Sequence, residues 1–138
     1  MPIDYAAVYS ALYTRVTDSD GAAVRALLGG TTSVFPRAEL NSLSGRVLPY
    51  LVFAEGGVTG ESEGMRDVLA SWWAYIAHTG NPRRLYQIAS ELDELYGSMS
   101  ALAIAGGRLG VTYIGRPFYD AALGLQGLEV RIGYRRLG

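Results

Sequence analysis

Apolar side chains recur every three or four residues near the start of the chain, which is the spacing of one face of a helix. The residues on this face are Tyr5, Val8, Tyr9, Leu12 and Val16. Asp4 precedes them and is a residue type that caps helix N-termini. Residues 18–21 interrupt the pattern. Beyond them, Val24, Leu27 and Leu28 predict a short second helix that ends at Gly29-Gly30, because glycine accepts the left-handed C-terminal conformation.

The clearest helical pattern lies over about 81–97. Asn81 is a good N-cap, and proline at position 82 is tolerated at the first helical position. The apolar stripe that follows consists of Leu85, Ile88, Ala89, Leu92, Leu95 and Tyr96, and the opposite face is polar. We therefore predict an amphipathic helix that packs one face on a core and ends near Gly97.

Other segments alternate with the period of a strand. In the last segment, Leu128, Val130, Ile132 and Tyr134 alternate with Glu129, Arg131 and Arg135, which predicts a half-buried antiparallel strand. Residues 47–55 predict a second strand, with Pro49 at its start or on an edge. Residues 109–113 predict a third. Gly106-Gly107 is typical of a hairpin turn after the apolar run 101–105.

Residues 65–78 fit two patterns. A helix would align Met65, Leu69, Trp72, Trp73 and Ile76 on one face. A strand would place Val68, Trp72 and Ile76 on one face and Leu69, Trp73 and Tyr75 on the other. The valine, tryptophans, tyrosine and isoleucine favour a strand, which is our prediction, with the helix as the alternative.

Residues 31–46 and 56–64 show no sustained period and predict loops. Val34 and Phe35 are expected to anchor the first loop, and the second is rich in glycine and acidic residues. The order of elements predicts a single α+β domain over 1–138. Its sheet is expected to be mostly antiparallel, with the N-terminal helix and the 81–97 helix packed on one face.

Composition and charge exclude several classes of function. The chain has 138 residues, 49% apolar and 18% charged, which is typical of one globular domain. A formal net charge of −1 gives no electrostatic footprint for tight nucleic-acid binding. Without cysteine, disulfides and thiol chemistry are excluded, and a single histidine excludes a multi-histidine metal site. We see neither a signal peptide nor a membrane span, so synthesis in the cytoplasm is expected.

Candidate chemistry is sparse. The sequence has no nucleophile-elbow motif whose serine His78 could activate. We therefore expect His78 to be a solvated side chain. Glu61, Glu63 and Asp67 do not have the spacing of a calcium loop. The glycines at 106, 107 and 110 match no nucleotide-binding loop. We therefore expect no catalytic residue, no cofactor and no metal.

The aromatic content indicates assembly. Ten tyrosines and two tryptophans exceed what a solitary monomer of this size needs, and such residues are enriched at interfaces. Trp73, Tyr75 and Leu69 are the candidate subunit interface, and packing under a helix of the same chain is the alternative. Glu129, Arg131 and Arg135 are expected to face a lumen or a neighbouring subunit.

The paired arginines at 83–84 and 135–136 fit either a solvated face or salt bridges to a partner.

The order of segments resembles the tail-terminator, or tail-completion, family of long-tailed bacteriophages. The resemblance runs through VRALLGG, VFP, LPYLVFAEGG, SWWAYIAHTG, the Asn-Pro helix, GRLGVTYIG, the aspartate-containing loop PFYDAALG and LEVRIGYRR. It implies a non-enzymatic virion protein that forms a ring, usually a hexamer, on the head-proximal end of the tail tube. The implied partners are the tail tube protein and the head-tail connector or stopper, with DNA only as passing genome.

Two other functions remain open. One is another component of the head-tail junction, such as a head-closure or tube-like protein. The other is a dimeric α+β ligand-binding or regulatory module that uses an open sheet face.

Overall fold

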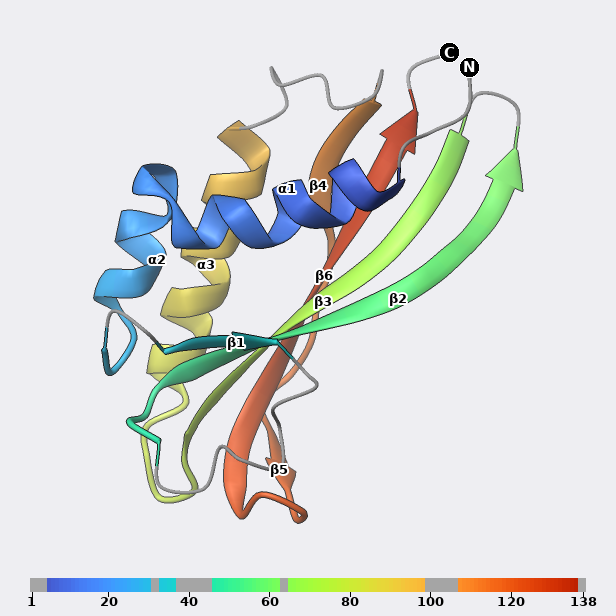
Figure 1. Cartoon of the computed structure of the whole chain (residues 1–138). Helices are drawn as coiled ribbons and strands as arrows, with labels where there is room; N and C mark the ends of the chain where they lie inside the picture. The colour runs from blue at the N-terminus through green and yellow to red at the C-terminus, as the bar shows by residue number, and fades with distance from the viewer. Residues whose placement is uncertain (1–4, 31–32, 37–45, 63–64, 99–106, 137–138) are drawn as a thin grey trace.

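The computed structural model describes residues 5–30, 33–36, 46–62, 65–98 and 107–136. These residues form a six-stranded sheet with helices on one face (Figure 1). The strand order is β1-β2-β3-β6-β4, and β5 pairs with β6. Only β1 and β2 are parallel, and the other strand pairs are antiparallel. The predicted α+β fold is confirmed.

The described helices are α1 (Tyr5–Thr17), the 3-10 turn η1 (Ser19–Gly21), α2 (Ala22–Ala26) and α3 (Arg83–Ser98). The described strands are β1 (Val34–Pro36), β2 (Tyr50–Ser62), β3 (Met65–Ala77), β4 (Gly107–Ile114), β5 (Phe118–Asp120) and β6 (Leu125–Arg136). Asp4, the predicted cap of the first helix, lies outside the described residues.

Side chains that bond to the backbone hold the corner between α1 and α2. Asp18 Oδ1 accepts a hydrogen bond from the backbone N–H of Asp20 at 2.8 Å. The Arg25 guanidinium donates to the carbonyl oxygens of Val16 (2.7 Å) and Asp18 (2.5 Å). A Cβ at Gly21 would lie 2.2 Å from the Val16 carbonyl oxygen, so this close approach requires glycine.

The helix predicted over 81–97 is confirmed as α3. Asn81 Oδ1 accepts a hydrogen bond from the backbone N–H of Arg83 at 2.9 Å, which satisfies one of the free donors at the helix start. All six residues of the predicted apolar stripe are buried. They pack with α1 and with the helix-side face of the sheet in one core.

A chain of two buried hydrogen bonds links three elements across this core. Trp72 Nε1 in β3 donates to Tyr96 Oη in α3 at 2.7 Å. The Tyr96 hydroxyl donates in turn to the carbonyl oxygen of Leu12 in α1 at 2.5 Å. Burial raises the pKa of Tyr96 well above its usual value, because the charged phenolate would lose its hydration.

The segment 65–78 forms strand β3, as predicted, and the helix alternative is wrong. Trp72, Ala74 and Ile76 lie in the helix-side core. Each residue of β3 from Ala70 to Ala77 has a partner in β6, and each residue from Ala70 to Tyr75 also has one in β2. Both faces of this segment are apolar because one face packs in the helix-side core and the other, with Trp73 and Tyr75, packs in a second apolar cluster.

The loop predicted over 56–64 is wrong as far as residue 62, because β2 continues to Ser62. Residues 63–64 lie outside the described part. The ladder between β2 and β3 shifts register between Glu55 and Val58 and again between Thr59 and Glu61. The glycines at 56, 57 and 60 fall within these irregularities, where glycine is common. Their loop-like composition therefore reflects bulges in a strand.

Two short strands were not predicted. Residues 34–36 of the predicted loop 31–46 form β1, which pairs with β2 in parallel, and Val34 and Phe35 are buried as expected. Residues 31–32 and 37–45 lie outside the described part. Residues 118–120 of the expected PFYDAALG loop form β5, which pairs with β6. A three-residue strand gives too little alternation for the period of two to show.

The remaining strands match the prediction with shifts at their ends. β2 begins at Tyr50, directly after Pro49 and three residues later than predicted. Gly107 lies in β4 opposite Arg136, so the hairpin turn predicted at Gly106-Gly107 is wrong for Gly107. Residues 101–106 lie outside the described part. In β6, the four alternating apolar residues are fully buried, as predicted: Leu128, Val130, Ile132 and Tyr134.

Candidate assembly interface

The sheet face away from the helices, here called the outer face, carries its own aromatic cluster. Its buried members are Phe35, Tyr50, Val52 and Tyr75. They alternate along β2 and β3 with residues of the helix-side core, so the pleat turns them to the outer face. Burial and the carboxylate of Asp120 both raise the pKa of Tyr50. The sheet therefore has apolar residues on both faces.

The three residues predicted at a subunit interface lie in β3 but differ in exposure. Tyr75 is only 3% exposed and donates a hydrogen bond from its hydroxyl to Asp120 Oδ2 at 3.2 Å. Trp73 is half-buried, and its ring meets that of Phe118 edge to face with centroids 5.8 Å apart. Leu69 lies in β3, and its side chain is outside the described part. Of the two described side chains, Trp73 keeps the larger accessible surface.

A glycine makes room for the rings on the outer face. Gly127 in β6 lies opposite Tyr75 in β3 and Phe118 in β5. A Cβ at this position would lie 2.8 Å from the Tyr75 ring and 3.0 Å from the Phe118 ring. The aromatic rings therefore lie directly against the β6 backbone, which brings Phe118 close to Trp73.

Glu129 and Arg131 of β6 lie on the outer face next to this cluster. The Glu129 carboxylate accepts a hydrogen bond from Ser71 Oγ at 2.8 Å and pairs with Arg131 Nε at 3.1 Å. The Glu129 side chain is 14% exposed and that of Arg131 is 48% exposed. The Arg131 guanidinium also lies 4.8 Å from the ring centre of Tyr113. Arg135 belongs to β6, and its side chain is outside the described part.

Exposed apolar residues gather on one edge of the sheet. β4 and β5 lie one after the other along β6, joined at Gly115, whose N–H donates to the Glu129 carbonyl oxygen at 2.8 Å. The exposed large side chains here are Tyr113 (48%), Ile114 (41%), Phe118 (36%) and Tyr119 (55%). By the register, Tyr113 and Phe118 turn to the outer face, and Ile114 and Tyr119 turn to the other face. We call these four residues along the edge the edge patch. Exposed apolar side chains along an edge strand are a common site of protein association.

The edge patch was not predicted from the sequence. The sequence pattern predicts a strand at Tyr113 and a loop at Phe118 and Tyr119. The available signal was four large apolar residues within 113–119, interrupted by Gly115, Arg116 and Pro117. That density of apolar side chains in a segment without a period is unusual for a solvated loop.

The remaining titratable candidates show no catalytic arrangement within the described residues. His78 is exposed, and its ring packs against that of Tyr119 with centroids 4.4 Å apart. Glu63 and the side chains of Glu61 and Asp67 lie outside the described part. Within the described segments, no group of three or more His, Cys, Asp or Glu residues is arranged to hold a metal ion. No helix among them is long and apolar enough to cross a membrane.

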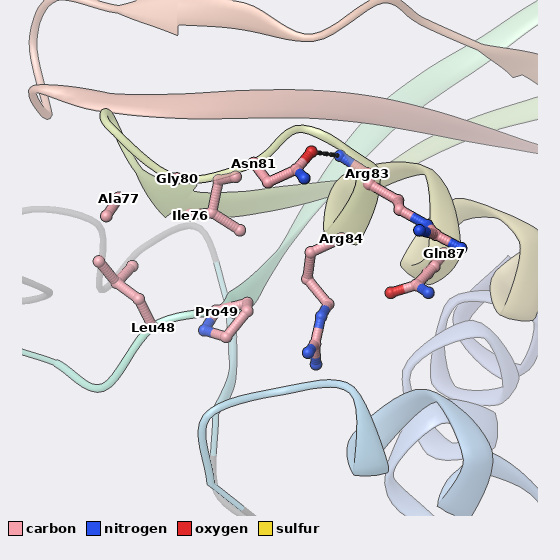
Figure 2. Close-up of a pocket in the computed structure, with 9 residues that line it drawn as sticks. All are labelled: Leu48, Pro49, Ile76, Ala77, Gly80, Asn81, Arg83, Arg84 and Gln87. Atoms are coloured by element: carbon pink, nitrogen blue, oxygen red, sulfur yellow. Dashed lines mark hydrogen bonds between the residues drawn. The ribbon is translucent and has the colours of Figure 1, made fainter.

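An open pocket of about 480 Å³ lies where the start of β2 and the end of β3 meet the start of α3 (Figure 2). Leu48, Pro49 and Ile76 form apolar walls, and Arg83 and Arg84 are its basic residues. Arg84 donates a hydrogen bond to the Leu27 carbonyl oxygen at 3.2 Å. Neither arginine forms an ion pair with any residue in the described part of the chain. We call this site the arginine pocket.

Comparison with known structures shows a shared fold. A chain from the "Virion of native gene transfer agent (GTA) particle" is similar over 97% of this chain and 97% of its own length, with a TM-score of 0.60 and 14% sequence identity. At this identity the likeness establishes the fold alone. The sequence matches no protein-family model and no curated protein.

Proposed function

We propose that this protein is a structural component of a phage-like virion. It forms a ring at the head-proximal end of the tail tube, where it ends tube polymerisation and joins the tail to the head connector. The observation that carries the proposal is the fold shared end to end with a gene transfer agent virion chain. The order of segments that resembles tail terminators supports the same role.

The proposed action is structural, not enzymatic. A growing tube presents the same surface after each added ring, so its growth needs an external stop. A terminator binds that surface with one face of its ring and presents a different surface on the other face. The next tube ring then has nothing to bind, and the head connector can dock instead.

The proposed partners follow from this position. They are further copies of the chain in a ring of about six, the tail tube protein, and the connector or stopper protein. DNA passes through the ring without specific binding, consistent with a formal net charge of −1. Synthesis in the host cytoplasm and a final location in the virion are part of the proposal.

The residues proposed to mediate assembly are Trp73 and the edge patch, which hold most of the exposed aromatic surface on the described sheet. Leu69 and Tyr75 remain proposed as neighbours of this contact. Tyr75 would act mainly by positioning the rings around it, since its own chain already covers it. Glu129, Arg131 and Arg135 are proposed to face the lumen or an adjacent subunit.

Another component of the head-tail junction is the second candidate. The similar chain comes from a whole gene transfer agent particle, so the shared fold fits a head-closure or tube-like protein of such a particle equally.

Electron microscopy of the purified protein, with its mass measured under native conditions, tests the proposal. We expect closed rings that bind one end of purified tail tubes. Rings that stack into long tubes by themselves would instead identify a tube-like protein. A chain that stays monomeric in the presence of tubes would contradict the proposal.

A further inference from the structure

The part of the β2–β3 hairpin before Ala70 in β3 separates from the rest of the sheet. β2 pairs with β1 only at residues 51–53, and β3 pairs with β6 only from Ala70 onward. Residues 56–62 and 65–69 therefore form a two-stranded ribbon. In Figure 1 the ribbon runs past the helices toward the upper right. A two-stranded ribbon by itself is only marginally stable in water, so a long one is expected to rest on a partner.

The ribbon has an acidic sequence. Residues 56–69 contain Glu61, Glu63 and Asp67 against one basic residue, Arg66, which gives a formal charge of 1 − 3 = −2. Arg66 lies opposite Glu61 in the register, and Asp67 lies opposite Thr59. The register therefore places a basic residue directly opposite only one of the two acidic residues within 56–62 and 65–69.

The arginine pocket lies at the opposite end of the same two strands. It is lined by the residues just before β2 and at the end of β3, whereas the ribbon is formed by the end of β2 and the start of β3. Its two arginines have no acidic partner in the described part of the chain. Arginine is well suited to pair with carboxylates at an interface. One end of the molecule thus carries unpaired positive charge and the other carries net negative charge.

We propose that the ribbon of one copy docks into the arginine pocket of the next copy. This inference rests on the proposed ring, because it names the contact that would join its subunits. Two complementary surfaces at opposite ends of one chain make a head-to-tail contact, and such contacts generate rings when the rotation closes. The apolar walls of Leu48, Pro49 and Ile76 would receive the ribbon beside the charges.

Charge reversal tests the contact from both sides. Arg83→Glu with Arg84→Glu, and separately Glu61→Arg with Asp67→Arg, should each weaken ring formation by about tenfold or more. Combining all four changes should restore rings at least in part, because the charges are again complementary. The matched control is Asp93→Arg with Glu94→Arg, which reverses two exposed charges on the same helix outside the pocket. This control should leave ring formation unchanged.

The measurements are native mass, ring counts by electron microscopy, and thermal unfolding of every variant. The changed side chains in α3 are exposed, so these variants should stay folded. As a second readout, rings of the unmodified protein should dissociate as salt rises toward about 1 M, where charges are screened within roughly 3 Å.

The outcomes distinguish a failure of the ribbon-to-pocket contact from a failure of the proposed function. Rings that survive either charge reversal and high salt would overturn the ribbon-to-pocket contact and leave the proposed function standing. Loss of rings in both charge-reversal variants, without any recovery when the four changes are combined, would also overturn this pairing. An unmodified chain that never forms rings, alone or on tubes, would overturn both. Normal rings that have lost binding to a nucleic acid or a connector would assign the arginines to that partner and overturn the contact.

Discussion

The buried hydroxyl of Tyr96 makes two hydrogen bonds within the core. It accepts a hydrogen bond from Trp72 and donates one to Leu12, so it joins β3, α3 and α1. We predict that Tyr96→Phe keeps the shape of the core but leaves the buried Trp72 Nε1–H without its acceptor, while the Leu12 carbonyl oxygen, inside α1, loses only its additional donor. A buried donor left without a partner costs about 1–3 kcal/mol. Chemical denaturation should report this loss, whereas Tyr86→Phe, on the exposed side of the same helix, should change stability little.

The raised pKa of Tyr96 also predicts an alkaline transition. In the unfolded chain the phenol loses its proton near its ordinary pKa of 10.0, whereas the folded chain retains it. Above about pH 10 the folded state then binds more protons than the unfolded state. The free energy of unfolding therefore keeps the full contribution of Tyr96 below about pH 10 and decreases as the pH rises further. Thermal midpoints measured from about pH 8 to 11 should fall less steeply in Tyr96→Phe. An identical fall in both proteins would show that Tyr96 does not contribute.

Trp73 and Trp72 are adjacent in sequence and lie on opposite faces of β3. Trp72 is fully buried, whereas Trp73 is half-buried beside Phe118. We predict that Trp73→Ala weakens assembly by about 2 kcal/mol or more, as truncation of a central interface aromatic does, with a smaller effect on the monomer's thermal midpoint. Trp72→Ala, the matched variant, should destabilise the monomer by about 3–5 kcal/mol. If Trp73→Ala unfolds the chain outright, this residue belongs to the monomer core.

At the scale of elements, the outer face of β6 provides a test of the charged positions. Arg131 is about half exposed, and surface ion pairs contribute only about 0–1 kcal/mol. Arg131→Ala should therefore leave the fold intact, as should Glu129→Ala, judged by circular dichroism and thermal unfolding. Arg25→Ala is the contrasting variant and should lower the thermal midpoint, because the Arg25 guanidinium donates hydrogen bonds to two backbone carbonyls at the α1–α2 corner. If both changes on β6 prevent folding, these charges are needed within the domain itself.

Elements with a long, regular pattern could be predicted from the sequence. The stripe of α3 and the alternation of β6 are set by burial of one face, which the local pattern records directly. The sequence of β3 also carried a signal, because its aromatic and β-branched residues fit a central strand. The continuation of β2 through glycines 56, 57 and 60 could not be seen locally, because it depends on pairing with β3.

The candidate assembly interface was also predictable only in part, because contacts between residues distant in sequence leave no local pattern. Trp73 stood out as an aromatic residue in a strand with two apolar faces. The burial of Tyr75 depends on distant residues, including Asp120 and the glycine at 127, which become neighbours only in the folded sheet. The edge patch depends on β4 and β5 following one another along β6, a placement that no local pattern records.

At the scale of the whole molecule, the sheet and its surroundings offer several surfaces to other chains. One sheet face packs under the helices, and the other carries Trp73 and a pair of charges. The edge patch, the acidic ribbon and the arginine pocket lie at the periphery. Such a distribution of surfaces fits a protein that contacts several neighbouring chains in an assembly.

The most direct test of the proposed role is the length of tails made without the protein. Deleting its gene and imaging the resulting lysate by electron microscopy measures tail length and the attachment of tails to heads together. We predict tails of abnormal length that are not joined to heads, while capsids still fill with DNA, because tube growth has lost its stop and the connector its docking surface. Tails of normal length attached to heads would contradict the proposed role.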